Sequence, residues 1–188
     1  MSKASEAPAI PGSVRVRPAV PADAEAIRRI YNHEVENTTA TMDLVPRSLA
    51  DQRDWLAART GAFTALVAVR PAGPEADPDL VSGAEEVVGF AALSPYKERA
   101  AYRPTVEDSV YVRRDLGRQG VGRLLLESVV ELARSSGFHS VMARIEASGE
   151  ASRALHAACG FELVGIEKEV GRKFNRWLDV ALMQKLLP

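Results

Sequence analysis

Hydrophobic and polar residues alternate with a period of two from Thr105 to Val112, and this alternation predicts a β-strand with two different faces. The residues expected on one face are Val106, Val110 and Val112, and those expected on the other are Glu107, Ser109 and Tyr111. The second face carries a carboxylate in the middle of the strand. We therefore expect this strand to combine a packing face with a face that can carry chemistry.

A helical period replaces the alternation after a turn that contains Gly120 and Gly122, and Gly137 supplies the stop. The apolar positions of this expected helix are Val121, Leu124, Leu125, Val129 and Leu132. Glycines at the start of a helix let backbone amides approach a ligand, and the helix dipole makes that end favour an anion. The turn therefore predicts an anion-binding site.

Two common phosphate-binding motifs do not fit this turn. Gly117 and Gly122 have the glycine spacing of a P-loop, but Arg123 follows where a lysine is required. A dinucleotide fingerprint that began at Gly120 would need its third glycine at Leu125. Both a nucleotide triphosphatase and a dinucleotide-dependent enzyme are thus disfavoured.

The rest of the chain shows the same two periods, interrupted by proline and glycine. We expect strands near residues 14–18, 63–69, 86–93, 139–145, 161–164 and 174–183, and helices that begin near residues 21, 48 and 151. Strands dominate the two ends and helices lie between them, which predicts an α/β fold with a mixed sheet. The proline- and glycine-rich residues 70–85 are interpreted as an extended hairpin loop.

Length and composition favour small-molecule chemistry. A chain of 188 residues with 46% hydrophobic residues is expected to form one domain, here 14–188, preceded by a flexible tail at 1–13. Because 24 basic and 25 acidic side chains leave a net charge of −1, no electrostatic footprint for nucleic acid or membrane is expected. The single cysteine, Cys159, excludes an internal disulfide and favours a cytoplasmic location.

The sequence gives little support for a metal site or for a catalytic serine or cysteine nucleophile. His33 and Glu34 begin a zinc motif, but Asn37 stands where its second histidine is needed, so we expect no metal. No G-x-S-x-G elbow is present, and Cys159 is interpreted as a core residue rather than a nucleophile.

Three further stretches of sequence are characteristic, in addition to the segment 110–122, which consists of V-Y-V, a basic turn and G-x-G. Lys97, Arg99, Ala101 and Tyr102 lead into T-V-E-x-S-V-Y-V, I-Y-N-H occupies residues 30–33, and K-x-x-x-W-x-D-V occupies residues 173–180. From about residue 14 to 187 the chain resembles the phosphinothricin and methionine sulfoximine acetyltransferase branch of the GCN5-related N-acetyltransferases (GNATs). The resemblance implies a mixed, mostly antiparallel central sheet flanked by helices, with splayed central strands. It also implies acetyl-CoA as the acetyl donor and a homodimer.

The resemblance carries over a set of cofactor-binding residues. They are Val110, Tyr111, Val112, Arg118, Gln119, Gly120, Val121, Gly122, Arg123 and Ser152. Two positions depart from the family pattern. Gly117 stands where glutamine or arginine is usual, and Gly149 stands where an asparagine usually contacts the pantetheine arm.

The acceptor is expected to contact two loops. Lys97, Arg99, Tyr102 and Arg103 are candidates to anchor its carboxylate, because arginine binds carboxylates bidentately; the alternative is a solvated basic loop. The polar residues 37–41 either cover the acceptor or form a plain surface connection.

Acetyl transfer to an amine needs a proton acceptor, and Glu107 is the candidate, acting directly or through water. By analogy the backbone N–H of Val112 stabilises the oxyanion, and His156 donates a proton to the leaving thiolate. The alternatives are a solvent-facing carboxylate for Glu107 and a structural histidine for His156.

Together these observations predict an acetyl-CoA-dependent N-acetyltransferase acting on the α-amine of a small amino-acid-like acceptor, such as phosphinothricin, methionine sulfoximine or methionine sulfone. One alternative is a non-catalytic acyl-CoA sensor with the same fold, which the departures at Gly117 and Gly149 keep open. Another is an acetyltransferase for protein N-termini or polyamines, although the basic loop does not favour a cationic acceptor.

Overall fold

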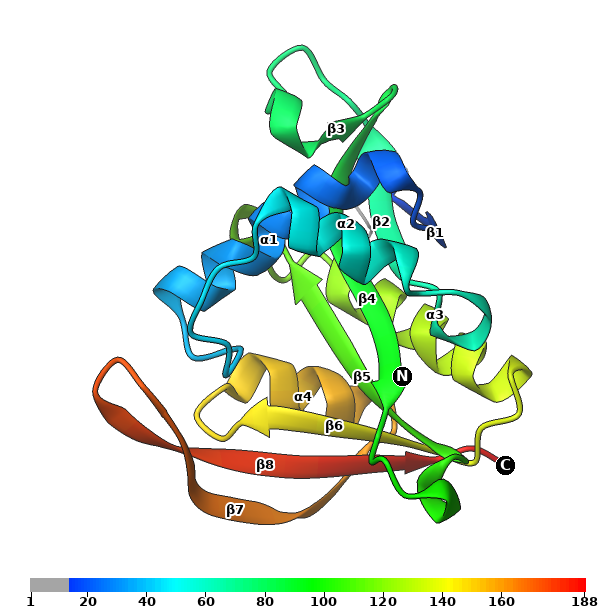
Figure 1. The fold of residues 1–188 in the computed structure, drawn as a ribbon, viewed down its shortest axis with the longest axis vertical. Helices are drawn as coiled ribbons and strands as arrows, with labels where there is room; N and C mark the ends of the chain where they lie inside the picture. Colours follow the sequence, from blue (N-terminus) through cyan, green and yellow to red (C-terminus); the bar gives the residue numbers. More distant parts are fainter. Residues whose placement is uncertain (1–13) are drawn as a thin grey trace, which may run out of the picture.

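A mixed sheet of eight strands organises residues 14–188, which are the part of the chain that the computed structural model describes (Figure 1). The strands are β1 (Arg15–Pro18), β2 (Leu66–Pro71), β3 (Val81–Ser82), β4 (Glu85–Pro95), β5 (Thr105–Val112), β6 (Ser140–Glu146), β7 (Glu162–Lys173) and β8 (Arg176–Leu186). The helices are α1 (Ala24–Asn37), α2 (Leu49–Ala57), α3 (Val121–Ser135) and α4 (Glu150–Ala158). The flexible tail expected at residues 1–13 lies outside the described residues.

The strand order is β1-β2-β4-β5-β6-β8-β7, with β3 paired to β4. Neighbouring strands are antiparallel except β5 and β6, which are parallel and pair only from Thr105–Glu107 to Ser140–Met142. Beyond that short junction the two strands diverge, and Figure 1 shows β5 running away from β6. The structure confirms the predicted mixed, mostly antiparallel sheet with splayed central strands.

Apolar residues gather in two cores, one on each face of the sheet. The core under α3 and α4 includes Val106, Leu125, Leu126, Val129 and Phe161, and the core under α1 and α2 includes Ile27, Tyr31, Val67, Val87 and Phe90. The expected alternation in β5 is confirmed, because Val106 packs in the first core and the ring of Tyr111 packs against the second. The helices thus hold the two faces of β5 in different surroundings.

Several predicted boundaries are wrong, and each has a local cause. The strand expected from Phe63 begins at Leu66, because Gly61–Phe63 forms a 3₁₀ turn. The strand expected at 161–164 continues to Lys173, and two register shifts in β7 break the alternation that would have revealed it. Phe174 was expected in a strand but lies in the β7–β8 turn, where its φ is 48°.

Candidate active site

The gap between β5 and β6 exposes polar backbone from β5. Arg113 donates its N–H to the carbonyl of Val88 on β4, and Tyr111 lies opposite Phe90 in the same ladder. Because hydrogen-bonding direction alternates along an antiparallel strand, the peptide groups of Val110 and Val112 point away from β4, into the gap. These two residues can therefore bind an extended ligand through the backbone, whereas Tyr111 directs its peptide groups to β4.

The turn after β5 leads directly into the N-terminus of α3. Arg118 and Gly120 have positive φ values of 63° and 83°, and the first turn of α3 leaves backbone N–H groups without helical partners. A Cβ atom at Gly122 would lie 3.2 Å from Leu155 Cδ2 and 3.7 Å from Val112 Cγ2, so this glycine lets α3 approach α4 and the end of β5. The arrangement is suited to an anion.

The polar side chains of this turn differ in how freely they can contact a ligand. The side chain of Arg118 is exposed, and that of Gln119 is half-buried beside Gly120. Arg123 instead forms an ion pair with Glu127 on the outer face of α3, with a distance of 2.8 Å. Arg118 and Gln119 are therefore better placed than Arg123 to contact a ligand at the turn.

The two departures from the family pattern have structural settings of their own. Gly117 is exposed, and a Cβ atom there would lie 3.4 Å from the carbonyl of Arg114. Gly149 precedes α4 and donates its N–H to the carbonyl oxygen of Glu146 at 2.8 Å. A Cβ atom at position 149 would lie 3.0 Å from that same oxygen, which is a tight contact. A side chain at position 149 would therefore need a small shift of the turn between β6 and α4.

Glu107 lies at the last paired position before β5 and β6 diverge. It stands opposite Ser94 of β4 and shares a face with Tyr111, beneath α1 and α2. Burial raises the pKa of Glu107, with Arg144 opposing this shift and Asp108 adding to it. A carboxyl group with a raised pKa at the mouth of a backbone-lined gap is suited to accept a proton.

His156 is buried on α4, on the opposite side of β5 from Glu107. Its Nδ1 lies 2.8 Å from the carbonyl oxygen of Ser152, and its Nε2 lies 3.1 Å from Oδ2 of Asp108. Burial is the largest single influence and lowers the pKa of His156, but the hydrogen bond and the charge of Asp108, together with the hydrogen bond to the Ser152 carbonyl, outweigh burial and raise this pKa. Both ring nitrogens therefore have protein acceptors, which favours a structural role for His156 over the expected proton donor.

Sequence reasoning missed Asp108, the partner of that histidine. Asp108 is 7% exposed and occupies the face of β5 that also carries Val106, Val110 and Val112. A carboxylate among alternating valines was the signal, because a charge on a core face is rare unless it is paired.

The basic loop after β4 forms its own hollow, at the start of β5. Lys97, Glu98, Arg99 and Tyr102 line a space of about 400 Å³. Lys97 Nζ lies 4.7 Å and 5.1 Å from the ring centroids of Tyr96 and Tyr102, and Arg103 is exposed beside them. The loop and the anion-binding turn lie at opposite ends of β5, with Glu107 between them.

Residues 37–41, the loop expected to cover the acceptor, form hydrogen bonds with two other parts of the chain. Thr39 Oγ1 donates to Glu146 Oε2 at 3.0 Å, and Lys173 Nζ donates to the carbonyl of Thr41 at 2.9 Å. These contacts tie the loop to the end of β6 and to the β7–β8 hairpin, close to the opening of the gap.

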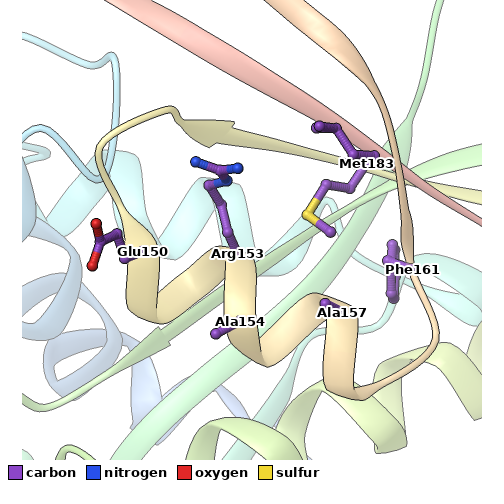
Figure 2. Close-up of a pocket in the computed structure, with 7 residues that line it drawn as sticks. Glu150, Arg153, Ala154, Ala157, Phe161 and Met183 are labelled. Atoms are coloured by element: carbon purple, nitrogen blue, oxygen red, sulfur yellow. The ribbon is translucent and has the colours of Figure 1, made fainter.

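A separate cavity of about 500 Å³ lies between α4 and strands β7 and β8 (Figure 2). Arg153 from α4 and Met183 from β8 extend into the space between these elements. None of the residues expected in the site lines this cavity.

Two classes of feature were sought throughout residues 14–188. No cluster of three or more metal-ligating side chains occurs in this range. None of the helices described there has the length and apolar character needed to cross a bilayer.

Comparison with known proteins gives concordant matches. Residues 16–182 match the sequence model of a family described as an acetyltransferase (GNAT) domain. The chain is 40% identical over 173 residues to an L-methionine sulfoximine/L-methionine sulfone acetyltransferase of Pseudomonas paraeruginosa, covering 92% of this chain and 94% of the relative.

Two solved structures extend the comparison. A phosphinothricin acetyltransferase from Sinorhizobium meliloti in complex with acetyl-CoA superposes with a TM-score of 0.81 at 36% identity, covering 93% of this chain and 88% of the other. A ribosomal-protein-alanine N-acetyltransferase from Brucella melitensis superposes with a TM-score of 0.81 at 40% identity, covering 92% of this chain and 99% of the other.

Proposed function

The chain belongs to the GNAT acetyltransferase family, and from this premise we propose that it transfers the acetyl group of acetyl-CoA to the α-amine of a small amino-acid-like acceptor. The Pseudomonas relative acts on methionine sulfoximine and methionine sulfone, and the Sinorhizobium structure is a phosphinothricin acetyltransferase. All three acceptors carry an α-amine beside a carboxylate. The observation that carries the proposal is the position of Glu107 at the mouth of the β5–β6 gap.

The residues present suit acetyl-CoA, which supplies the acetyl thioester when bound. The free N–H groups at the start of α3, with Gly120 and Gly122, would hold its diphosphate. The outward peptide groups of Val110 and Val112 would bind the pantetheine arm in the gap, as a neighbouring strand would. Ser152, half-buried on α4, flanks the same region.

The residues around the gap then have distinct tasks. Glu107 accepts the proton of the acceptor ammonium, directly or through water, so that the nitrogen lone pair can attack the thioester carbonyl. The N–H of Val112 faces the gap and would donate to the oxygen that becomes negative. As the amide forms, the nitrogen loses a second proton and the carbon–sulfur bond of the thioester would break, so that this proton balances the charge of the departing thiolate and CoA leaves as the thiol.

We expect the purified protein to release CoA with methionine sulfone, methionine sulfoximine or phosphinothricin as acceptor. A thiol-trapping assay at saturating acetyl-CoA measures this release, and mass spectrometry of the N-acetyl product excludes simple thioester hydrolysis. Calorimetry of acetyl-CoA binding serves as the control. Binding without turnover of any acceptor would overturn the proposal and favour an acyl-CoA sensor.

The similarity to the Brucella structure favours one second candidate, transfer to the N-terminal α-amine of a protein. A short peptide that begins with alanine tests it in the same assay. A peptide has no carboxylate on its first α-carbon, so the two acceptor classes place different demands on the protein. Turnover of the peptide with none of the free amino acids would establish the second candidate.

We also propose that two copies associate through the β7–β8 hairpin. β7 is an edge strand, and the hairpin exposes Val164, Val170, Phe174 and Trp177, with 61% of Trp177 accessible. Light scattering after gel filtration should therefore give the mass of a dimer, and Trp177→Glu should shift it toward a monomer. Leu44→Glu, at an equally exposed apolar residue outside the hairpin, is the matched control. A monomeric wild-type protein would contradict the proposal.

The single cysteine supports a cytoplasmic location, since a reducing compartment keeps such a thiol free. Cell fractionation with an antibody against the chain tests this location.

A further inference from the structure

Arg144 and Glu167 form an ion pair on the face of the sheet that points away from α4. Nη2 of Arg144 lies 2.9 Å from Oε2 of Glu167, and the two side chains are 39% and 34% exposed. Arg144 belongs to β6 and Glu167 to β7, and both strands pair with β8, where Leu182 and Val180 are their partners. The ion pair therefore connects the edge strand with the strand that borders the β5–β6 gap.

The strand register places Glu107 on this same face. Glu107 is paired with Met142 on β6, and Arg144 follows Met142 by two residues, so all three side chains point to one side of the sheet. Ala143 and Ile145 point to the other side, into the core under α3 and α4. In a regular sheet, the Cα atoms of residues placed like Glu107 and Arg144 are about 8 Å apart, which is within reach of an arginine side chain.

Three charged residues act on the Glu107 carboxylate, each from a different strand. Burial is the largest influence and raises the pKa of Glu107, and Arg144 is the strongest of the charges and lowers this pKa. Asp108 on β5 and Glu167 on β7 raise it further. The residue opposite Glu107 on β4 is Ser94, which is uncharged. Arg144 is therefore the cation that favours the ionised form of Glu107.

These opposing influences matter because a general base must be unprotonated when the acceptor arrives. An enclosed carboxyl group favours its protonated form, which cannot take a proton from the acceptor ammonium. A nearby cation offsets this effect, and a nearby acid adds to it. Glu167 works against Glu107 in two ways, because its own charge repels the carboxylate and its ion pair attracts the guanidinium of Arg144 toward β7.

The geometry of the ion pair leaves Arg144 able to attract a second carboxylate. Within residues 14–188, Oε2 of Glu167 is enclosed but has no hydrogen-bond partner, so its contact with Arg144 is not a well-aligned hydrogen bond. Arg17, by contrast, donates hydrogen bonds to both carboxylate oxygens of Asp23. A partly exposed ion pair contributes little to stability by itself, so the effect of Arg144 on Glu107 is its more important consequence.

We propose that Arg144 is a positioning residue for acetyl transfer, which keeps the carboxylate of Glu107 ionised near neutral pH, and that Glu167 moderates its charge. This inference rests on the proposed function and adds a residue that acts through the proton acceptor without touching a reacting atom. The balance between Arg144 and Glu167 then sets the lower limit of the pH range in which the enzyme works.

The test measures kcat/KM for methionine sulfone against pH in the wild type and in Arg144→Met. Removing the cation should move the acidic limb of the profile to higher pH, so that kcat/KM on the limb falls by up to about 10-fold, the lower end of the effect of a nearby opposite charge. Above the limb the two proteins should be nearly equal, because Glu107 is ionised in both. Added salt should reduce the difference, since Arg144 is partly exposed.

Three further variants vary the charge balance in a defined way. Glu167→Gln removes the repelling charge and releases Arg144, so the acidic limb should move to lower pH. Arg144→Lys keeps the positive charge and should restore most of the wild-type profile. Arg134→Met is the matched control, because Arg134 is 40% exposed and forms an ion pair with Glu131 on α3, and it should leave the limb in place.

A titration that needs no turnover separates this inference from the proposed function. Followed by carbon-13 NMR and identified by its absence in Glu107→Gln, the carboxyl carbon of Glu107 should titrate at higher pH in Arg144→Met than in the wild type. An unchanged titration in both Arg144→Met and Glu167→Gln, or a limb that moves equally in Arg134→Met, would overturn the role of Arg144 while leaving acetyl transfer established. A shifted titration without turnover of any acceptor would instead overturn the proposed function.

Discussion

Glu107→Gln is expected to lower kcat/KM for acetyl transfer about 10²- to 10⁴-fold, the contribution of a positioned general base. Glutamine has nearly the same shape but accepts no proton from the acceptor ammonium. Acetyl-CoA affinity should not change, because the turn at Gly120 is untouched. Initial rates of CoA release at varied acceptor concentration measure the effect, and Glu131→Gln on the exposed face of α3 is the matched control.

The pH dependence of the reaction follows from the same residue. Burial raises the pKa of Glu107, and a general base must be unprotonated. The wild-type rate should therefore fall as the pH decreases through this raised pKa, and Glu107→Gln should lose that acidic limb. A folded carboxyl group with a raised pKa contributes stability that is lost as the pH increases through that pKa, so the substitution should not lower Tm at pH 8. A fully active variant, or a wild-type rate that is flat across the acidic range, would contradict the role of Glu107.

Asp108→Ala is expected to reduce the free energy of unfolding by about 3–5 kcal/mol, since it leaves a buried imidazolium without its counterion. Asp108 and His156 are 7% and 4% exposed, so solvent screens their interaction little. His156→Ala should cost a similar amount by stranding the carboxylate. Urea denaturation followed by circular dichroism measures both values, and replacing both residues by leucine should recover most of the loss.

The contribution of His156 to stability should depend on pH in a defined direction. Its pKa in the folded state is raised above the ordinary value of about 6.5. The stabilisation is therefore complete below about pH 6.5 and is lost as the pH rises through the folded-state pKa. The stability difference between the wild type and Asp108→Ala should shrink over that window, and a difference that grows with pH would rule out the ion pair.

The catalytic question about His156 needs a separate measurement. A folded His156→Gln variant with an unchanged kcat across the pH range would exclude the proton-donor role expected from the sequence. Loss of the basic limb of the kcat profile would restore that role, despite the hydrogen bonds that both ring nitrogens make to Ser152 and Asp108.

Local patterns were sufficient to predict the elements around the gap. The alternation of Thr105–Val112 and the helical period after Gly120 reproduce β5 and the start of α3, because each period reflects burial on one face. The same rule failed in β7, where register shifts interrupt the alternation, and at Phe174, whose positive φ is unusual for an aromatic residue. Boundaries set by single backbone angles leave no trace in the hydrophobic pattern.

The candidate site also contains residues that the sequence predicted and residues that it did not. Glu107 and the glycine turn were predicted because each belongs to a local motif. The pairing of Asp108 could not be predicted in this way, because its partner His156 lies 48 residues away in the sequence. This contact depends on how α4 covers one face of β5, which no single stretch of sequence records.

Glu107, the proposed proton acceptor, occupies the last paired position between β5 and β6, where two halves of the sheet meet. Main-chain bonding fixes its place, whereas residues 37–41 and the arginine-bearing stretches around it belong to connecting segments that can lengthen, shorten or change character. If Glu107 acts as proposed, changes in these connecting segments would alter the choice of amine without moving the carboxylate. The two similar structures, whose names refer to phosphinothricin and to a ribosomal protein, fit this division between a fixed sheet and variable loops.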